Sequence, residues 1–281
     1  MSSNLYRIIN LRKPSIYAGF RGFIINQLSK IDAGGLAHNS IFRGANLGTI
    51  STLNEYLAFR TAHGIDDNTY KDLYIGDFFT IQDGTYNIVW IVAHFNYYDR
   101  IVNAPRGVTL FAVRKSDSNQ ITGKMKDTND TTGGYAATIP HTTTLPALAT
   151  ALQTVLGSYL VDIPVLISNS TNATALSMSG ADNYGAATDW EWVLSGCKAV
   201  LPNEIQIYGS MICSSSLFDA GEANEKLALF NFINQNAFGK YSFWLRSVSH
   251  SAAFVVGYDN GYSTKAGSTT SYALRPLIYI N

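Results

Sequence analysis

Titratable and nucleophilic side chains are few in this sequence, and they do not form a pattern typical of catalysis. The five histidines are scattered, and the chain contains no HExxH, GxSxG, phosphate-loop or dinucleotide-binding glycine motif. His94 and Asp99 could meet at a strand end, but such a pair is far more often structural. Asp182, Asp189 and Glu191 form the best candidate for a general-acid pair, and a solvated loop is the alternative. We therefore expect a protein that is not an enzyme.

Metal ligation also has little support. Asp66, Asp67 and Asn68 gather three oxygen donors, but they lack the alternating spacing and the distal glutamate of a calcium loop, and acidic turns after helices are common without metal. Cys197 and Cys213 lie sixteen positions apart. This spacing allows one disulfide, although two buried reduced thiols are the interpretation that we favour. We expect no metal and no cofactor.

The most informative stretch is a run of small, hydroxylic and aromatic residues near the C-terminus, between the blocks Phe243–Arg246 and Leu274–Ile280. Its side chains are too small and too polar for an ordinary core. Tyrosine gives large rigid contact area, and serine, glycine and asparagine give adaptable hydrogen bonding, so this composition favours recognition. We predict a display surface at 247–273 whose ligand-binding residues are Ser247, Ser249, His250, Ala253, Phe254, Tyr258, Asn260, Tyr262, Thr264 and Lys265.

Fixed residues on both sides of this run are expected to hold it in place. Trp244 lies beside Leu245 in an apolar strand, which favours core packing, although Trp190, Trp192 and Trp244 also offer ring faces that can stack on sugars. The guanidinium groups of Arg246 and Arg275 can donate hydrogen bonds to backbone carbonyls or to a carboxylate across the sheet. The predicted structural frame is Trp244, Arg246, Arg275 and Pro276.

The composition narrows the class of partner. The chain has 281 residues, with 20 basic and 20 acidic side chains, so its formal net charge of zero gives no reason to expect nucleic acid. Charged residues make up 14% of the chain, and this low share favours an exposed, virion-like protein over a cytosolic enzyme. We find neither a signal peptide pattern nor an apolar run near twenty residues, so we expect no membrane insertion.

The elements that must position these residues can be predicted from local signals. A helix is expected over 52–63, capped by Thr52 and Glu55. Strands are expected over 73–81, 86–92 and 107–113, with Asp83-Gly84 as a hairpin turn.

The second half of the chain gives similar signals. We expect a loop over 127–144, a helix over 145–156 with Thr144 as its cap, and a helix over 222–233 that begins at the Asp219/Glu222 pair. Further strands are expected around Trp244, around Val255 and over 274–280. Strands at both ends with few helices predict an α+β fold with an antiparallel sheet. Residues 1–45 read as a docking or oligomerisation arm, and a pair of strands within the same domain is the alternative.

A series of motifs runs along the chain from about residue 41 to its end. The motifs are, in order, Phe42–Gly48, Asp72–Asp77, Glu204 with Tyr208-Gly209-Ser210, Leu227–Phe230, Tyr241–Arg246 and Arg275-Pro276. This series resembles phage proteins with a C-type-lectin-like fold, found among phages of Gram-positive gut-type bacteria. The resemblance implies a C-type-lectin-like domain at 46–281 with a mostly antiparallel sheet, two or three helices and long loops, preceded by an N-terminal arm. The calcium-binding motif and paired disulfides of animal C-type lectins are not present, so calcium-dependent sugar binding is not implied.

This group is similar to the tropism determinants, or variable proteins, of diversity-generating retroelements. The resemblance implies that diversity arises by mutation of adenines in asparagine-type codons. Such codons cannot yield Lys, Glu, Gln, Met or Trp. Residues 247–273 contain none of these five amino acids except at Lys265. The resemblance implies a tail-tip or fibre protein of a virion, made in the bacterial cytoplasm, that binds a bacterial cell-surface protein or glycan. The arm would contact other virion proteins, and the oligomer would be a trimer.

Two other functions remain open at this point. A capsid or tail decoration protein would use the N-terminal segment for docking and would have no use for the display surface. A glycan-degrading enzyme would need a carboxylate pair such as the acidic group around Asp189.

Overall fold

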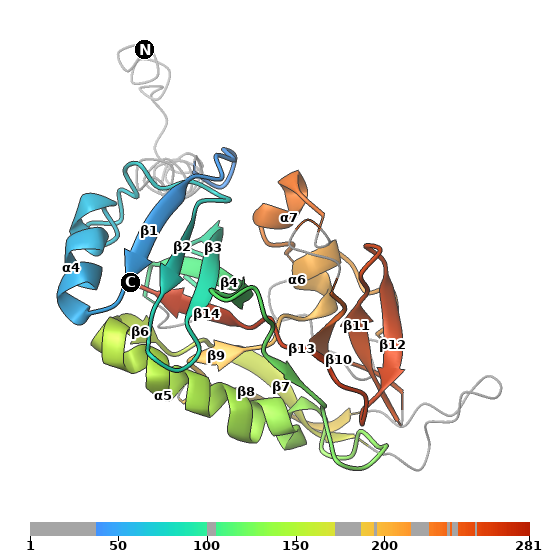
Figure 1. Ribbon diagram of the computed structural model, residues 1–281. Helices are drawn as coiled ribbons and strands as arrows, with labels where there is room; N and C mark the ends of the chain where they lie inside the picture. Colours follow the sequence, from blue (N-terminus) through green and yellow to red (C-terminus); the bar gives the residue numbers. More distant parts are fainter. Residues whose placement is uncertain are drawn as a thin grey trace, which may run out of the picture.

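The computed structural model describes residues 38–99, 105–171, 187–193, 196–214, 225–234, 237, 241–250 and 252–281, with the backbone alone for 168–171, 187–193 and 250. The other residues of the predicted arm, 1–37, lie outside the described part. The described residues fold into two large sheets, a separate β-hairpin and four short to medium helices (Figure 1).

The larger sheet has seven strands and holds the last strand of the chain in its interior. The order is β1-β2-β3-β4-β14-β6, and β9 also pairs with β14. Only β1 and β2 are parallel; the other pairings are antiparallel. The bounds are β1 Asn46–Ile50, β2 Phe78–Ile81, β3 Ile88–Phe95, β4 Val108–Lys115, β6 Leu160–Val161, β9 Ala199–Val200 and β14 Leu277–Ile280.

The smaller sheet has five strands in the order β12-β11-β10-β13-β5. Strand β10 pairs antiparallel with β11 and parallel with β13. The bounds are β5 Thr122–Gly123, β10 Phe243–His250, β11 Ala253–Gly257, β12 Ser263–Gly267 and β13 Tyr272–Ala273. The separate antiparallel hairpin joins β7 Val165–Thr171 to β8 Ala187–Val193.

The two sheets share one hydrophobic core. Phe111 on β4 lies 5.4 Å from Phe230 and 6.0 Å from Phe243 on β10, measured between ring centroids. Trp90, Trp244 and the three phenylalanines are almost completely buried. The fold is therefore mixed α+β with mostly antiparallel sheets and few helices, and this confirms the predicted class.

Two helices match their local sequence signals. Helix α4, Leu53–Ala62, begins with the predicted capping box, in which Thr52 accepts from the Glu55 N–H. Helix α5, Leu145–Leu156, has the predicted bounds and buries its apolar face; it lies along the larger sheet in Figure 1. Thr144 occupies the predicted N-cap position, but its side chain makes no capping hydrogen bond. A π-helix, Pro140–Thr144, precedes α5, so the backbone of Thr144 is already helical.

Other predicted boundaries need correction. The expected loop over 127–144 contains a 3₁₀ turn, Tyr135–Ala137, as well as the π-helix, and a second 3₁₀ turn, Gly157–Tyr159, follows α5. The expected helix over 222–233 is short: α7 covers only Leu229–Phe232, and its predicted start at Asp219 and Glu222 lies outside the described residues. Helix α6, Glu204–Tyr208, was not predicted.

The strand expected over 73–81 begins only at Phe78. Asp72 and Gly76 have positive φ angles of 52° and 88°, which lie outside the β region that strand residues usually adopt. The Asp77 carboxylate accepts hydrogen bonds from the backbone N–H groups of Tyr74 and Ala45, so residues 72–77 form a compact turn. By contrast, the turn predicted at Asp83-Gly84 is confirmed between the antiparallel strands β2 and β3.

Residues 38–45 belong to the folded unit and not to a separate arm. Phe42 forms a parallel β-bridge with Ile75, and Asn39 exchanges hydrogen bonds of 2.8 and 3.1 Å with the backbone of Phe95. Arg43 forms an ion pair of 2.7 Å with the buried Asp77. The described part of the predicted arm is thus bound to the larger sheet.

Candidate functional site

One exposed part of the predicted display surface, which holds three of the predicted ligand-binding residues, is the turn between β11 and β12, residues Tyr258–Tyr262, which we call the tip. The Tyr258 N–H donates to the Tyr262 carbonyl over 2.9 Å, and the Gly261 N–H donates to the Tyr258 carbonyl over 3.0 Å. Gly261 has φ +98°, where glycine is strongly favoured. The two tyrosine rings stack at 5.3 Å between centroids with an interplanar angle of 27°. The tip therefore presents an ordered aromatic pair.

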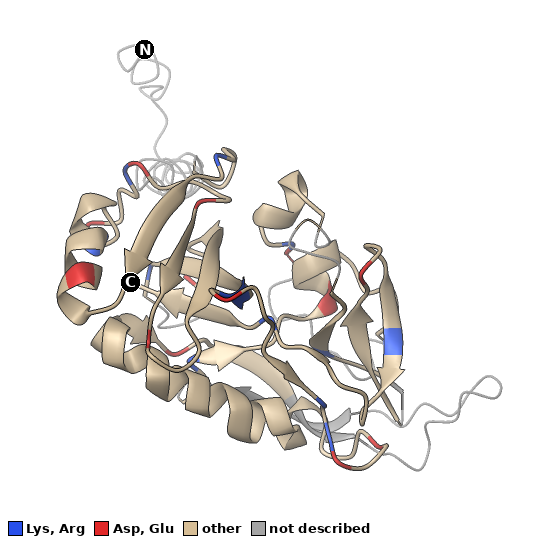
Figure 2. Ribbon diagram, viewed as in Figure 1, with Lys and Arg blue, Asp and Glu red and all other residues tan. Residues whose placement is uncertain are grey.

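The side chains of the tip face outward to different degrees. Tyr262 is 50% exposed and Asn260 is exposed, whereas Tyr258 is half-buried against the core. On the adjoining edge strand β12, Thr264 is half-buried and Lys265 is exposed. Figure 2 shows few charged residues along the ribbons of β11 and β12. These five residues are the part of the predicted site that solvent can reach.

Four other predicted ligand-binding residues are buried, and their expected exposure is wrong. Ser247 and Phe254 are 0% exposed, Ala253 is 3% exposed and Ser249 is 9% exposed. The reason is their place in the sheet: β10 and β11 are interior strands, and β11 is buried along its whole length. The serine hydroxyls satisfy buried backbone groups. For His250 the structure describes the backbone only, as the last residue of β10.

The four predicted frame residues lie inside the protein. The Trp244 indole N–H donates to the Gly123 carbonyl over 2.9 Å, which ties β10 to β5. Arg246 donates to the Leu201 carbonyl over 2.8 Å. The Arg275 guanidinium lies 5.1 Å from the centroid of the Phe243 ring, and burial lowers the pKa of Arg275 to about 10. The Pro276 carbonyl accepts from the Ala112 N–H over 2.9 Å, within the larger sheet.

Glu204 holds the base of the tip, a role that the sequence pattern does not predict. Its carboxylate is completely buried and accepts from the Cys213 N–H over 2.8 Å, from the Ser214 N–H over 2.9 Å and from the Ser263 hydroxyl. The Glu204 N–H donates to the Ser247 hydroxyl over 2.9 Å. Since Ser263 directly follows Tyr262, this network fixes the tip to α6 and β10.

A signal for α6 does exist in the sequence. Asn203 and Gln206 form a capping box, in which the Asn203 side chain accepts from the Gln206 N–H and the Gln206 side chain accepts from the Asn203 N–H. This spacing of an N-cap residue and a Gln three positions later marks a helix start. The pattern places Glu204 in the first turn, but burial of its carboxylate depends on contacts that are distant in the chain.

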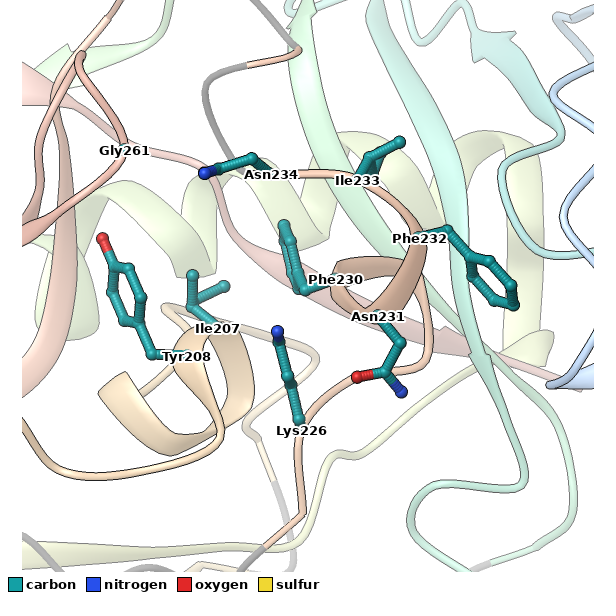
Figure 3. Close-up of a pocket in the computed structure, with 9 residues that line it drawn as sticks. All are labelled: Ile207, Tyr208, Lys226, Phe230, Asn231, Phe232, Ile233, Asn234 and Gly261. Carbon is teal, nitrogen blue, oxygen red and sulfur yellow. The ribbon is translucent and has the colours of Figure 1, made fainter.

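A hollow of about 320 Å³ lies on one side of the tip, between the end of α6, the chain around α7 and Gly261; we call it the lysine hollow. Figure 3 shows the polar ends of Tyr208, Lys226 and Asn234 around this space, with Ile207 and Phe230 between them. Burial and, to a smaller extent, the nearby Glu204 carboxylate raise the pKa of Tyr208, so its hydroxyl stays protonated at neutral pH.

A second hollow, of about 560 Å³, includes Asp259 of the tip. Tyr241 and Tyr272 contribute aromatic groups to it, and Gln120 and Thr122 contribute polar ones. The tip thus contributes to two hollows, one lined by Lys226 and the other by Asp259.

The catalytic candidates do not come together in the described residues. The His94 ring accepts from the Ala228 N–H over 3.0 Å in a buried site, which gives this histidine a structural contact. Asp182 lies outside the described residues, and Asp189 and Glu191 lie on β8, as do Trp190 and Trp192, without described side chains. The acid-pair and sugar-stacking hypotheses for these residues stay predictions.

The structure describes the side chains of the predicted metal-ligand candidates and of both cysteines. Asp67 accepts from the N–H and the hydroxyl of Thr69 in a local turn. Within the described ranges, no three His, Cys, Asp or Glu side chains gather in a way that could hold a metal ion. Cys197 is a buried reduced thiol, as expected, while Cys213 is also reduced but only half-buried. No helix in the described part of the chain is long and apolar enough to cross a bilayer.

Comparison of the chain with protein-family models, with curated proteins and with solved structures gives no match in any of the three.

Proposed function

We propose that this chain is a non-enzymatic receptor-binding protein of a phage virion, placed at a tail tip or fibre, which recognises a bacterial surface ligand through the tip. The observation that supports this most strongly is the pair of stacked tyrosines, Tyr258 and Tyr262, on a turn whose base is fixed by the buried Glu204 network. Aromatic residues with few rotatable bonds, held in place before binding, lose little conformational entropy on contact with a partner.

The division between buried base and exposed tip suits a recognition surface. Substitutions at exposed positions away from packing usually change stability by within about 0.5 kcal/mol. Asn260, Tyr262 and Lys265 are exposed, so their side chains can change without disturbing β10 and β11 beneath them. Specificity could then change while the fold is retained.

The phage assignment and the C-type-lectin-like fold of residues 46–281 rest on the resemblance of the sequence motifs. The mixed α+β architecture is compatible with such a domain. We propose both as part of the same account, together with oligomerisation on the virion, because several weak sites held close together gain avidity.

The test is a binding measurement with the purified full chain. Fluorescently labelled protein should bind saturably to cells of the bacterial host, and excess unlabelled protein should block adsorption of the phage that carries it. Antibodies against the protein should label the tail of that phage in electron micrographs. Absence of saturable binding to host cells, or labelling confined to the capsid, would contradict the proposal and favour a decoration protein.

A further inference from the structure

The lysine hollow contains the ammonium group of Lys226, which forms no ion pair with a carboxylate of the described residues. The Lys226 side chain is half-buried. Partial burial of an unpaired charge costs free energy. An anionic group that enters the hollow would remove that cost, so the hollow is suited to a ligand with negative charge.

The position of the ammonium group is set by packing of the lysine stem. Gly209 ends α6 with φ +86°, and a Cβ at this position would lie 3.4 Å from Lys226 Cδ. The lysine stem therefore packs across the helix end. Leu227, which follows Lys226, is fully buried, and its N–H donates to the Gln206 carbonyl over 2.9 Å. Lys226 is thus next to a packed residue, while its charged end points into the hollow (Figure 3).

The rest of the lining consists of neutral polar groups and apolar surface. Tyr208, Asn231 and Asn234 supply hydroxyl and amide groups, and Phe230 and Ile207 supply apolar area. The volume of about 320 Å³ is at the lower end of the roughly 300–1,000 Å³ range of small-molecule sites. A ligand that matches this lining would carry hydroxyl groups, one negative charge and an apolar ring face. An acidic monosaccharide has all three features.

We propose that the lysine hollow binds the carboxylate of an acidic sugar unit in a surface glycan, with Lys226 as the charge partner and Asn234 and Tyr208 as hydrogen-bonding groups. This inference rests on the proposed receptor-binding function and names its ligand class. A single ammonium balances one negative charge, and the lining has no arginine fork of the kind that recognises a phosphate dianion. The carboxylate is therefore favoured over a phosphate group.

The experiment is a ligand-observed NMR titration of the full chain with glucuronate, glucose and glucose 6-phosphate. We expect glucuronate to bind at least ~tenfold more tightly than glucose, because a charge-assisted hydrogen bond is about twice as strong as a neutral one. Lys226→Gln should abolish this preference, and Lys226→Arg should retain most of it. Lys71→Gln removes an exposed lysine outside the hollow and should change nothing.

Each outcome decides the assignment. Equal binding of glucose and glucuronate, or a preference that survives Lys226→Gln, would overturn it, and tighter binding of glucose 6-phosphate would replace the carboxylate by a phosphate. Circular dichroism of each variant shows whether it is folded, and Asn234→Ala, which keeps the charge, should weaken glucuronate binding without changing the preference for charge. If glucuronate fails to bind while the protein still binds host cells, the ligand class is wrong and the receptor-binding function stands.

Discussion

At the scale of single residues, Glu204 connects the candidate site to the fold. The buried carboxylate accepts from Cys213, Ser214 and Ser263, and each of these bonds has a charged acceptor. Such bonds contribute about 1.5–3 kcal/mol each to stability, more than neutral ones. The tip is therefore expected to depend on Glu204 for its order as well as for its position.

Glu204→Gln should lower the free energy of unfolding by about 2–3 kcal/mol, because the amide replaces one acceptor oxygen by a donor that faces N–H and O–H groups. Urea denaturation followed by tryptophan fluorescence measures this change. Glu55→Gln is the matched control, since Glu55 is exposed and Gln also completes a capping box. A loss below 0.5 kcal/mol in Glu204→Gln, no larger than in the control, would show that the network contributes little.

His141 is expected to make the folding stability of the protein decrease as the pH falls. It lies in the π-helix before α5, 5.1 Å from the ring of Tyr135, and burial lowers its pKa below the usual value near 6.5. The unfolded chain therefore binds this proton more readily than the folded one. The contribution of neutral His141 to stability is therefore fully present above the pKa of this histidine in the unfolded chain. It is lost as the pH decreases from about 7 toward 5.

Thermal melting across this pH range, compared between the parent protein and His141→Gln, measures the effect. The variant should show a flatter decrease in melting temperature between pH 7 and pH 5. An unchanged slope would mean that His141 is protonated equally well in both states.

At the scale of elements, the pair β4 and β14 lies in the interior of the larger sheet, and the two strands approach closely. Gly107 directly precedes β4, and a Cβ added there would lie 2.3 Å from the Ile280 carbonyl oxygen. Because that atom belongs to the backbone of β14, the clash cannot be relieved by a side-chain rotation. Only glycine allows this strand pair to approach so closely.

Gly107→Ala should cost about 3 kcal/mol or more, as expected when overpacking displaces backbone. Gly48→Ala is the control: its Cβ would meet nothing within 4 Å, and its φ of +93° alone should cost about 1–2 kcal/mol. Chemical denaturation of both variants gives the comparison. Equal losses would show that the contact with Ile280 is not a constraint.

Elements with strong local signals could be predicted from the sequence, and burial of short strands could not. The capping box of α4 and the apolar face of α5 are encoded within a few residues, and both helices were placed correctly. The run of small, hydroxylic and aromatic residues predicts that Ser247 and Phe254 lie at the surface. Their burial arises from the position of β10 and β11 inside a sheet built from distant segments, which composition does not reveal.

At the scale of the whole molecule, residues 38–45 extend the folded unit beyond the predicted domain boundary. The Arg43 guanidinium pairs with the Asp77 carboxylate, which is 0% exposed, and it also donates to Asp72. Hydrogen bonding to Asp77, opposed by partial burial and aided by Asp72, raises the pKa of Arg43 above its usual value. This contact joins the first described segment to the larger sheet.

Arg43→Met should therefore destabilise the protein by about 2–3 kcal/mol, since it leaves the buried Asp77 carboxylate without its cation. The control is Arg114→Met, which removes an exposed arginine at the end of β4 and should cost less than about 0.5 kcal/mol. Differential scanning calorimetry of the two variants measures both values. Similar melting temperatures for the parent and Arg43→Met would place the segment outside the cooperative unit.

The site as a whole was predicted only in part. The composition of residues 247–273 predicts that Tyr258, Asn260 and Tyr262 lie at the surface, and in the tip Asn260 and Tyr262 are exposed while Tyr258 is half-buried. The two hollows beside it are formed by segments as far apart as Gln120, Lys226 and Asp259, so no local pattern could predict them.

The most direct measurement of the central claim pairs host-cell binding with thermal stability for Tyr262→Ala. Because Tyr262 is 50% exposed, we expect binding to fall at least ~tenfold while the melting temperature stays within about 2 °C of the parent. Tyr86→Ala, at the turn between β2 and β3, removes a tyrosine far from the tip in sequence and should leave binding unchanged. Full binding by Tyr262→Ala, or a loss of binding that accompanies unfolding, would contradict the account.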